Sequence, residues 1–323
     1  MRHFLTTITR QQSWPIDEER YHSLLASKQR ILAWLQIEEV FGYVVEWWCD
    51  MEAHIHGRSL RSQGAPLSST TRRARFFEDR ANADRLMLAF LSATRMYLDH
   101  VATHVPQVAE PDTHFANSVK TIRNRYRGRS GFFIVADTLR NIVQHESYGV
   151  NRVSYSSAML GRPTADASVQ CALSLPVTDL TPIVSKLEDM LKPRCHMRKH
   201  SGNRESRIRH EISLVRAIRL PCELRTIMRH FCADLATMHD EVRAGVQAPV
   251  EEAIRVCEEA YKGHHVESQG ESGVLACTDA NGEMGERGEW IGSAAVERLR
   301  HLRECFSGWE TIRTSVYGAP VKP

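Results

Sequence analysis

Apolar residues at helical spacing dominate the chain. They recur at steps of three and four residues, so that one face of each segment is apolar, and this periodicity predicts helices. Pro15 lies at the start of the first predicted helix, where the first turn tolerates proline. The chain is therefore expected to be mainly α. The predicted helices span about 14–55, 75–105, 117–146, 180–192, 220–245, 249–262 and 292–309.

Polar and alternating segments interrupt this pattern. Residues 57–72 are rich in Gly, Ser and Thr, and residues 106–116 contain two prolines, so both are predicted to be connections. Residues 150–180 contain SVQCALSLPV, whose alternation and β-forming residues predict one or two strands, with RVSYSS as the partner strand of a hairpin. The Gly-rich segment 263–289 is predicted to be an irregular, flexible loop.

These elements suggest three consecutive parts. Residues 1–74 form an N-terminal helical segment and a linker, and residues 75–245 form a helical core with the β insertion around 150–180. Residues 246–323 contain the C-terminal helices and the flexible loop at 263–289. No internal repeat is present in the sequence.

Composition narrows the class of protein. A hydrophobic fraction of 42% and a charged fraction of 25% are typical of a soluble globular chain. No segment reaches the roughly 18–20 apolar residues that a membrane helix needs, and the N-terminus lacks the apolar core of a signal peptide. A cytoplasmic protein without membrane contact is expected. Its eight cysteines are scattered without a CxxC pair, so reduced thiols are expected.

The type of basic residue is more informative than the net charge. The net charge of +3 carries no global nucleic-acid signature. However, the 42 basic residues include only seven lysines, which leaves 35 arginines. Arginine makes forked contacts to phosphate that lysine cannot make. A coding bias toward arginine would produce the same excess, so both explanations stay open.

The segment TLRNIVQHESYG, residues 138–149, combines polar groups that can perform chemistry. On a helical wheel, Asp137, Asn141 and His145 form one row, and Arg140 and Gln144 form the adjacent row. All five lie opposite an apolar stripe. The stripe consists of Phe132, Val135, Ala136, Leu139, Ile142 and Val143.

Two interpretations of this polar face are open. It can be the solvated side of an amphipathic helix, or it can be a reaction centre. An arginine followed by a histidine is a weak pattern in a chain with 35 arginines, and Arg225 and His230 have the same spacing. The surrounding sequence therefore has to support the second interpretation.

The context resembles the HEPN superfamily. Its members pair an arginine, usually followed by a polar residue, with a histidine four to six residues further on, as in Arg140, Asn141 and His145. Residues 82–101 resemble the helix that packs beside the signature helix in one bacterial branch of HEPN-like proteins, and residues 223–242 resemble a later helix there. The resemblance covers roughly residues 75–245 and implies a HEPN-like helical bundle.

This resemblance implies a function. Many HEPN proteins are metal-independent endoribonucleases that leave 2′,3′-cyclic phosphate ends and act as toxins or phage-defence effectors. It implies that His145 serves as acid or base, that Arg140 clamps the phosphate and that Asn141 positions it, with Asp137 and Gln144 as flanking binding residues. RNA, a homodimeric partner copy and an antitoxin or defence protein are the implied partners, and no cofactor is expected. Other HEPN proteins are inactive and only bind RNA or nucleotides, or serve as scaffolds.

Two further groups are weaker candidates. His100 and His104 have the helical spacing of zinc ligands but lack the glutamate of a metalloprotease motif, so no metal is expected. Alternatively, Asp99 and His100 lie beside the signature helix and assist it. The basic segment 194–210 is predicted to be exposed, either as an RNA-backbone contact or as a solvated charge run. Its basic residues are Arg194, Arg198, Lys199, Arg204, Arg207 and Arg209.

Overall fold

The fold was analysed in a computed structural model of the 323-residue chain. The structure describes residues 2–6, 12–63, 69–109, 114–145, 153–160, 168–192, 202–262, 267–268, 271–279 and 288–309.

The protein is mainly helical with small antiparallel sheets, as the sequence predicts. The helices in the described residues are α1 (Glu18–Gln63), α2 (Ser69–Val108), α3 (His114–Arg127), α4 (Gly131–His145), α5 (Thr181–Asp189), α6 (Gly202–Arg216), α7 (Leu224–Lys262) and α8 (Ala294–Cys305). The strands are β1 (Arg2–Thr6), β2 (Ser13–Ile16), β3 (Ser154–Leu160), β4 (Ser168–Ser174), β5 (Pro176–Val177), β6 (Cys222–Glu223), β7 (Glu267–Ser268), β8 (Glu271–Asp279) and β9 (Glu289–Gly292).

The chain divides into two compact units that are each discontinuous in sequence. Unit 1 contains Met1–Gly42, Tyr97–Lys120 and His239–Ser307, and unit 2 contains Tyr43–Met96, Thr121–Met238 and Gly308–Pro323. The three long helices α1, α2 and α7 each contribute residues to both units.

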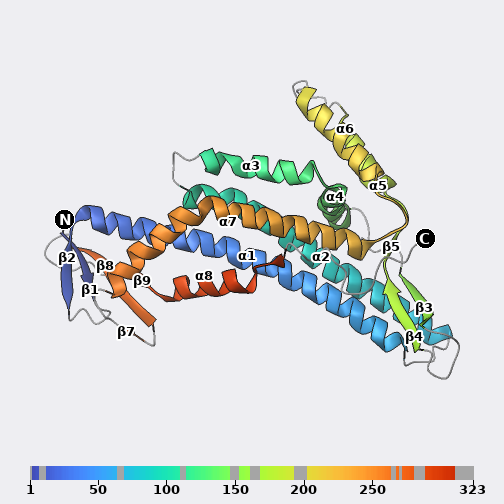
Figure 1. The fold of residues 1–323 in the computed structure, drawn as a ribbon, viewed down its shortest axis with the longest axis horizontal. Helices are drawn as coiled ribbons and strands as arrows, with labels where there is room; N and C mark the ends of the chain where they lie inside the picture. The colour runs from blue at the N-terminus through green and yellow to red at the C-terminus, as the bar shows by residue number, and fades with distance from the viewer. Residues whose placement is uncertain are drawn as a thin grey trace. The chain divides into compact units, whose positions relative to one another are not determined.

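Unit 1 combines helical segments with an antiparallel sheet. Strand β8 is the centre of this sheet, because it pairs with β1, β7 and β9, and β1 pairs in turn with β2. The strands gather beside the first turns of α1 (Figure 1). Gly273 of β8 faces the ring of Trp290 on β9, and a Cβ atom there would lie 2.2 Å from that ring. Glycine is therefore required where this ring covers β8.

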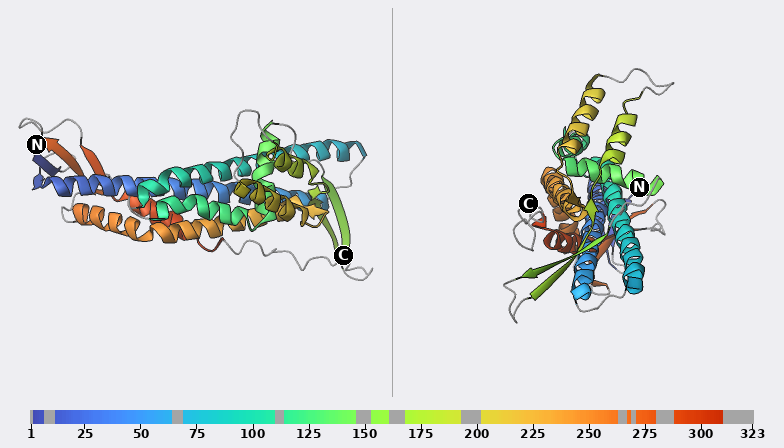
Figure 2. Two further views of the ribbon diagram at one scale, coloured as in Figure 1. Left: turned by 90° about the horizontal axis from the view of Figure 1, so that it is seen from above. Right: turned by 90° about the vertical axis from the view of Figure 1, so that its right-hand side faces the viewer.

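Unit 2 is built on halves of the same three helices, which run side by side in both views of Figure 2. Phe90 of α2 and Phe231 of α7 meet edge to face with ring centroids 6.1 Å apart. Buried apolar side chains fill the space between the helices, and this burial is the main favourable term in folding. They include Met51, Ile55, Leu86, Met87, Leu91, Ile227, Met228 and Leu235.

The predicted hairpin is confirmed in unit 2. Strands β3 and β4 pair antiparallel from Ser154 opposite Ser174 to Leu160 opposite Ser168. The backbone N–H of Leu173 donates a hydrogen bond of 2.9 Å to the hydroxyl oxygen of Ser59 on α1. The hairpin is therefore tied to the helical part of the unit.

The helix predicted over 117–146 is in fact two helices, α3 and α4. The chain leaves α3 at Gly128, and the hydroxyl oxygen of Ser130 accepts a hydrogen bond of 3.2 Å from the backbone N–H of Phe133. Ser130 is thus an N-cap residue for α4. The sequence Gly128-Arg-Ser-Gly131 contained this signal, because glycine favours the end of a helix and serine favours the start of the next.

Gly131 fixes the start of α4 against α6. A Cβ atom at this position would lie 2.6 Å from the carbonyl oxygen of Leu214, a backbone atom that cannot move aside alone. We expect Gly131→Ala to lower the free energy of unfolding by about 1–3 kcal/mol, as overpacking does. Urea unfolding followed by circular dichroism measures the change. Gly57→Ala is the matched control, because that helical glycine has open space around it. Equal stability of the two variants would contradict the close approach.

Four other predicted boundaries are wrong. Strand β2 occupies part of the segment predicted to begin the first helix, and α1 instead starts at Glu18. At this start, Asp17 Oδ1 accepts a hydrogen bond of 2.6 Å from the N–H of Arg20. At their other ends, α1 continues into the predicted 57–72 linker and α2 continues past Pro106 to Val108. Finally, α7 continues through Pro249, where the sequence predicted a break between two helices. Buried Val246, Val250 and Ala253 hold both sides of this proline in the core.

Two predicted irregular segments contain regular structure. The prediction of a Gly-rich loop over 263–289 is wrong for residues 267–268 and 271–279, which form β7 and β8, and for Glu289, which begins β9. Residues 263–266, 269–270 and 280–287 lie outside the described residues. Part of the basic segment 194–210 belongs to α6. Its Ile208, Ile212 and Val215 are buried at helical spacing.

Candidate functional site

Helix α4 carries the predicted reaction centre. It packs against α5 and α6, and Phe133 meets Phe231 of α7 edge to face at 4.9 Å. Of the predicted apolar stripe, Val135, Ala136 and Ile142 are buried, whereas Phe132, Leu139 and Val143 are only half-buried. Because neighbours cover the helix on more than one side, Phe133 and Ile134 outside the stripe are buried as well. The polar face of α4 is therefore confined to its second half.

Arg140 and Asn141 lie together at the beginning of this exposed part. Asn141 is exposed and Arg140 is half-buried, and Arg140 Nη1 donates a hydrogen bond of 3.4 Å to Asn141 Oδ1. The Nε atom of Arg140 is buried and has no hydrogen-bond partner among the described residues. The backbone of α4 extends to His145, but the side chains of Gln144 and His145 lie outside the described residues.

Asp137, one turn before Asn141, is engaged by arginines. Arg127 Nη1 donates a hydrogen bond to Asp137 Oδ2, and Arg123 Nη2 lies 3.7 Å from Asp137 Oδ1. The same Arg127 binds both carboxylate oxygens of Glu211 on α6, at 2.9 and 3.0 Å. Asp137 is therefore a counter-ion that ties α4 to α3, and Arg127 connects both helices to α6.

Arg127 is the centre of this arrangement. Burial alone would lower the pKa of its guanidinium, but hydrogen bonds and negative charge from Glu211 and Asp137 outweigh burial and raise the pKa. A forked guanidinium can bind two carboxylates in fixed geometry. Removing one partner of such a half-buried network would leave uncompensated charge behind.

A basic surface surrounds this network and is called the arginine cluster below. His210 of α6 contacts the carbonyl oxygen of Gly128 at 3.0 Å, so the basic ends of α3 and α6 lie side by side. The cluster holds seven arginines against three carboxylates (Asp137, Glu205 and Glu211), an excess of four positive charges. Its arginines are Arg123, Arg125, Arg127, Arg129, Arg204, Arg207 and Arg209.

The arginine cluster was only partly predictable. Arg204, Arg207 and Arg209 were candidates for RNA contact, whereas Arg194, Arg198 and Lys199 lie outside the described residues. Arg127 and Glu211 were missed because they are separated by 84 positions in the sequence. The available signal was Glu211 itself, a carboxylate on the same helix face as buried Ile208 and Ile212.

The second Arg–His match in the sequence has a structural role. Arg225 and Arg229 of α7 both bind Glu52 of α1, at 2.7 and 2.6 Å, and His230 stacks on Phe132 with centroids 4.5 Å apart. Burial alone would raise the pKa of Glu52, but the two arginines lower it. These half-buried groups are therefore engaged in contacts within unit 2.

Asp99 and His100 belong to unit 1, whereas Arg140 and Asn141 belong to unit 2. His100 and His104 lie on one face of α2 with ring centroids 5.2 Å apart. Burial, followed by the neighbouring His104, lowers the pKa of His100. His104 contacts the side chain of Gln107 at 3.2 Å. Within the described residues, no group of three or more His, Cys, Asp or Glu side chains is placed to hold a metal ion.

Unit 1 contains a buried polar centre that the sequence did not indicate. His239 of α7 lies with Nδ1 3.0 Å from the hydroxyl of Tyr97 and Nε2 3.1 Å from Glu38 Oε2. Arg243 donates to both oxygens of Glu38 at 2.9 and 2.7 Å. Although Tyr97, His239 and Glu38 form a linear relay, all three are fully buried, so a substrate cannot reach them.

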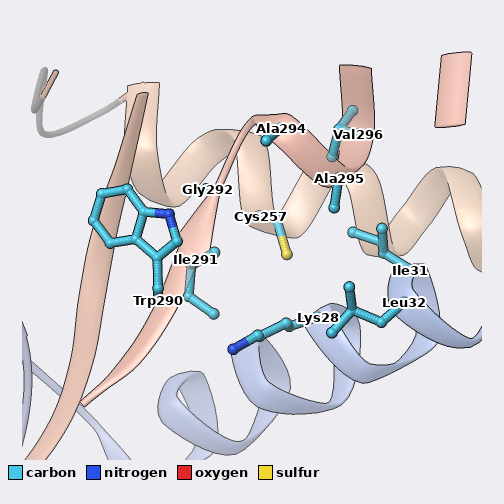
Figure 3. Close-up of a pocket in the computed structure, with 10 residues that line it drawn as sticks. All are labelled: Lys28, Ile31, Leu32, Cys257, Trp290, Ile291, Gly292, Ala294, Ala295 and Val296. Carbon is cyan, nitrogen blue, oxygen red and sulfur yellow. The ribbon is translucent and has the colours of Figure 1, made fainter. Parts of the chain in front are cut away.

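A hollow of about 230 Å³ with largely apolar walls lies in unit 1 (Figure 3). Ile31, Leu32, Trp290 and Ile291 contribute to its walls, and the sulfur of Cys257 points toward it. Burial raises the pKa of the Cys257 thiol to about 11. The thiol is protonated at neutral pH and is a poor nucleophile there.

Comparisons of the chain with protein-family models, with curated proteins and with solved structures found no match. Among the described helices, none combines the length and apolar character needed to cross a bilayer. The chemistry of the site therefore has to be inferred from its own residues.

Proposed function

We propose that this protein binds RNA through the arginine cluster and cleaves it, without a metal, at the exposed face of α4. The observation that carries the proposal is the junction at Asp137. This residue binds Arg127 and Arg123 of the cluster and begins the row that continues through Asn141 to His145.

Phosphate binding is the first part of the proposal. Arg125, Arg129, Arg207 and Arg209 are exposed, and an excess of positive charge attracts a polyanion. Arg127 is paired with Glu211 and Asp137, so its role is to hold the helices that carry the exposed arginines. A strand bound to the exposed arginines would be delivered to the face of α4.

Cleavage is the second part. The 2′-oxygen attacks the phosphorus, a new P–O2′ bond forms and the P–O5′ bond breaks. The 2′-hydroxyl proton passes to a base, and an acid gives a proton to the departing 5′-oxygen, which leaves a 2′,3′-cyclic phosphate and a 5′-hydroxyl. Because a histidine side chain ordinarily changes its protonation near neutral pH, His145 would serve as base or acid. Arg140 would compensate the developing phosphorane charge, and Asn141 would orient the phosphate. The same histidine of a second copy would supply the other proton transfer.

The second candidate function is RNA binding without cleavage. The burial of Arg140 Nε favours it, because a half-buried guanidinium presents only part of its fork to a phosphate. In that case, α4 would position the arginine cluster and perform no chemistry.

Binding is tested with a single-stranded RNA of mixed sequence, titrated by fluorescence anisotropy across a salt series. We expect a variant with Arg125, Arg129 and Arg207 changed to Ala to bind more weakly. The slope of log affinity against log salt should fall by about 2, since each lost phosphate contact removes about 0.7.

Arg255→Ala provides the control, because this exposed arginine of α7 is paired with Glu252 and Glu259 outside the cluster. Its affinity and salt slope should equal those of the wild type. If the triple variant kept the wild-type slope, the arginine cluster would not be the RNA surface.

A further inference from the structure

A different surface of unit 2 combines aromatic rings with unpaired carboxylates. On α1, Tyr43 and Trp47 are exposed large side chains, at 46% and 39%. Glu46 and Asp50 are exposed beside them. At about 100° per residue, the four side chains fall within one sector of roughly 100° and form a single stripe. We call Tyr43, Glu46, Trp47 and Asp50 the aromatic–acidic stripe.

The stripe has no partner within the described part of the chain. None of its four side chains makes a hydrogen bond, an ion pair or a ring contact with another described side chain. The neighbouring residues differ, since Trp48 meets Trp309 edge to face and Glu52 is held by two arginines. Only the outward-facing side chains of the stripe lack such contacts with described side chains.

Among the described residues, no basic side chain pairs with the charges of the stripe, which are of one sign. Glu46 and Asp50 are one helical turn apart, an arrangement that destabilises an isolated helix. Burial is the main cause of the raised pKa of the adjacent Cys49 thiol, and the negative charges of Asp50, Glu46 and Glu52 raise this pKa further. A nucleic-acid phosphate would be repelled here, whereas a cation would be attracted.

We propose that the aromatic–acidic stripe binds an arginine-bearing segment of a partner protein. A guanidinium group stacks on the face of a Trp or Tyr ring and donates forked hydrogen bonds to a carboxylate at the same time. Lysine offers a compact charge without the flat stacking surface, so the stripe selects arginine over lysine. The rings alternate with the carboxylates along α1, which suits a segment that presents arginines on one side.

The test uses a fluorescein-labelled nine-residue peptide of alternating Arg and Ala, and its Lys analogue, titrated with RNA-free full-length protein at physiological ionic strength. We expect the Arg peptide to bind and the Lys peptide to bind at least about fivefold more weakly. Trp47→Ala, and separately Glu46→Gln with Asp50→Asn, should each weaken binding of the Arg peptide by about tenfold.

Two control variants distinguish peptide binding at the aromatic–acidic stripe from non-specific binding elsewhere on the protein. Phe77→Ala removes another exposed aromatic residue of unit 2, and Glu19→Gln removes an exposed carboxylate elsewhere on α1. Both should leave binding unchanged. Equal binding of the two peptides, or equal losses in all variants, would overturn the proposal. So would a concentration-dependent dimer in sedimentation that the stripe variants abolish, because a second copy would then occupy the surface.

Discussion

Glu38→Gln is expected to destabilise the protein by about 3 kcal/mol at neutral pH, the largest stability effect of a single conservative change here. The substitution keeps the size of the side chain but removes its charge. Arg243 then loses its buried counter-charge, and an NH2 donor replaces one of the two oxygens that accept from Arg243 and His239. Comparing the free energies of unfolding in urea measures the effect.

The physical reason is the environment of Glu38. Burial alone would raise the pKa of this fully buried carboxyl, but His239 and Arg243 outweigh burial and lower the pKa from 4.5 to about 2. Burial also lowers the pKa of His239, which therefore donates to Glu38 as a neutral imidazole while its other nitrogen accepts from Tyr97. Because His239 is neutral, the guanidinium of Arg243 supplies the positive charge that compensates the Glu38 carboxylate.

The pH dependence gives a second readout of the same variant. A carboxyl whose pKa is lowered by folding stabilises the protein above its unfolded value of 4.5, and this contribution is lost as the pH falls toward about 2. The difference between wild type and Glu38→Gln should therefore shrink across that window. Glu39→Gln is the matched control, since Glu39 is a surface partner of Arg298 at 3.7 Å and should change stability by less than about 1 kcal/mol. A difference that did not vary with pH would refute the assignment to Glu38.

The sequence predicted the features that depend on local periodicity. The long helices follow from apolar spacing, and the β3–β4 hairpin follows from alternation in SVQCALS. It did not predict β1, because five residues near the N-terminus become a strand only by pairing with Leu275–Asp279 of β8. The continuation of α7 past Pro249 likewise depends on tertiary packing, which overrides local propensity.

The candidate site shows the same division. The placement of Arg140 and Asn141 on one polar helix face follows from the wheel, but the engagement of Asp137 by Arg127 does not, because it requires α3 to fold back beside α4. Buried ionic groups such as Glu38 and Glu211 are equally hidden in a linear pattern. The catalytic role of His145 and the HEPN resemblance stay predictions.

Arg140→Ala and His145→Ala are each expected to reduce RNA cleavage by at least about 100-fold, the largest functional effect predicted here. The assay incubates single-stranded RNA with protein in excess EDTA and detects new 2′,3′-cyclic phosphate ends. Binding of the same RNA should change by less than about threefold, because the exposed arginines of the cluster are intact. Growth arrest on induced expression of the wild type, relieved in both variants, is the expected effect in cells.

The controls for cleavage are Arg255→Ala and His301→Ala, an exposed arginine and an exposed histidine of unit 1. If these variants cleave like the wild type while Arg140→Ala and His145→Ala do not, the chemistry belongs to α4. If the wild-type protein binds RNA with the salt dependence expected of the arginine cluster but produces no cyclic phosphate ends, RNA binding without cleavage is the function. If it neither binds nor cleaves RNA, the polar face of α4 is the solvated side of a structural helix. These outcomes differ because the phosphate-binding arginines and the α4 residues are separate sets that meet at Asp137, so each can be removed without removing the other.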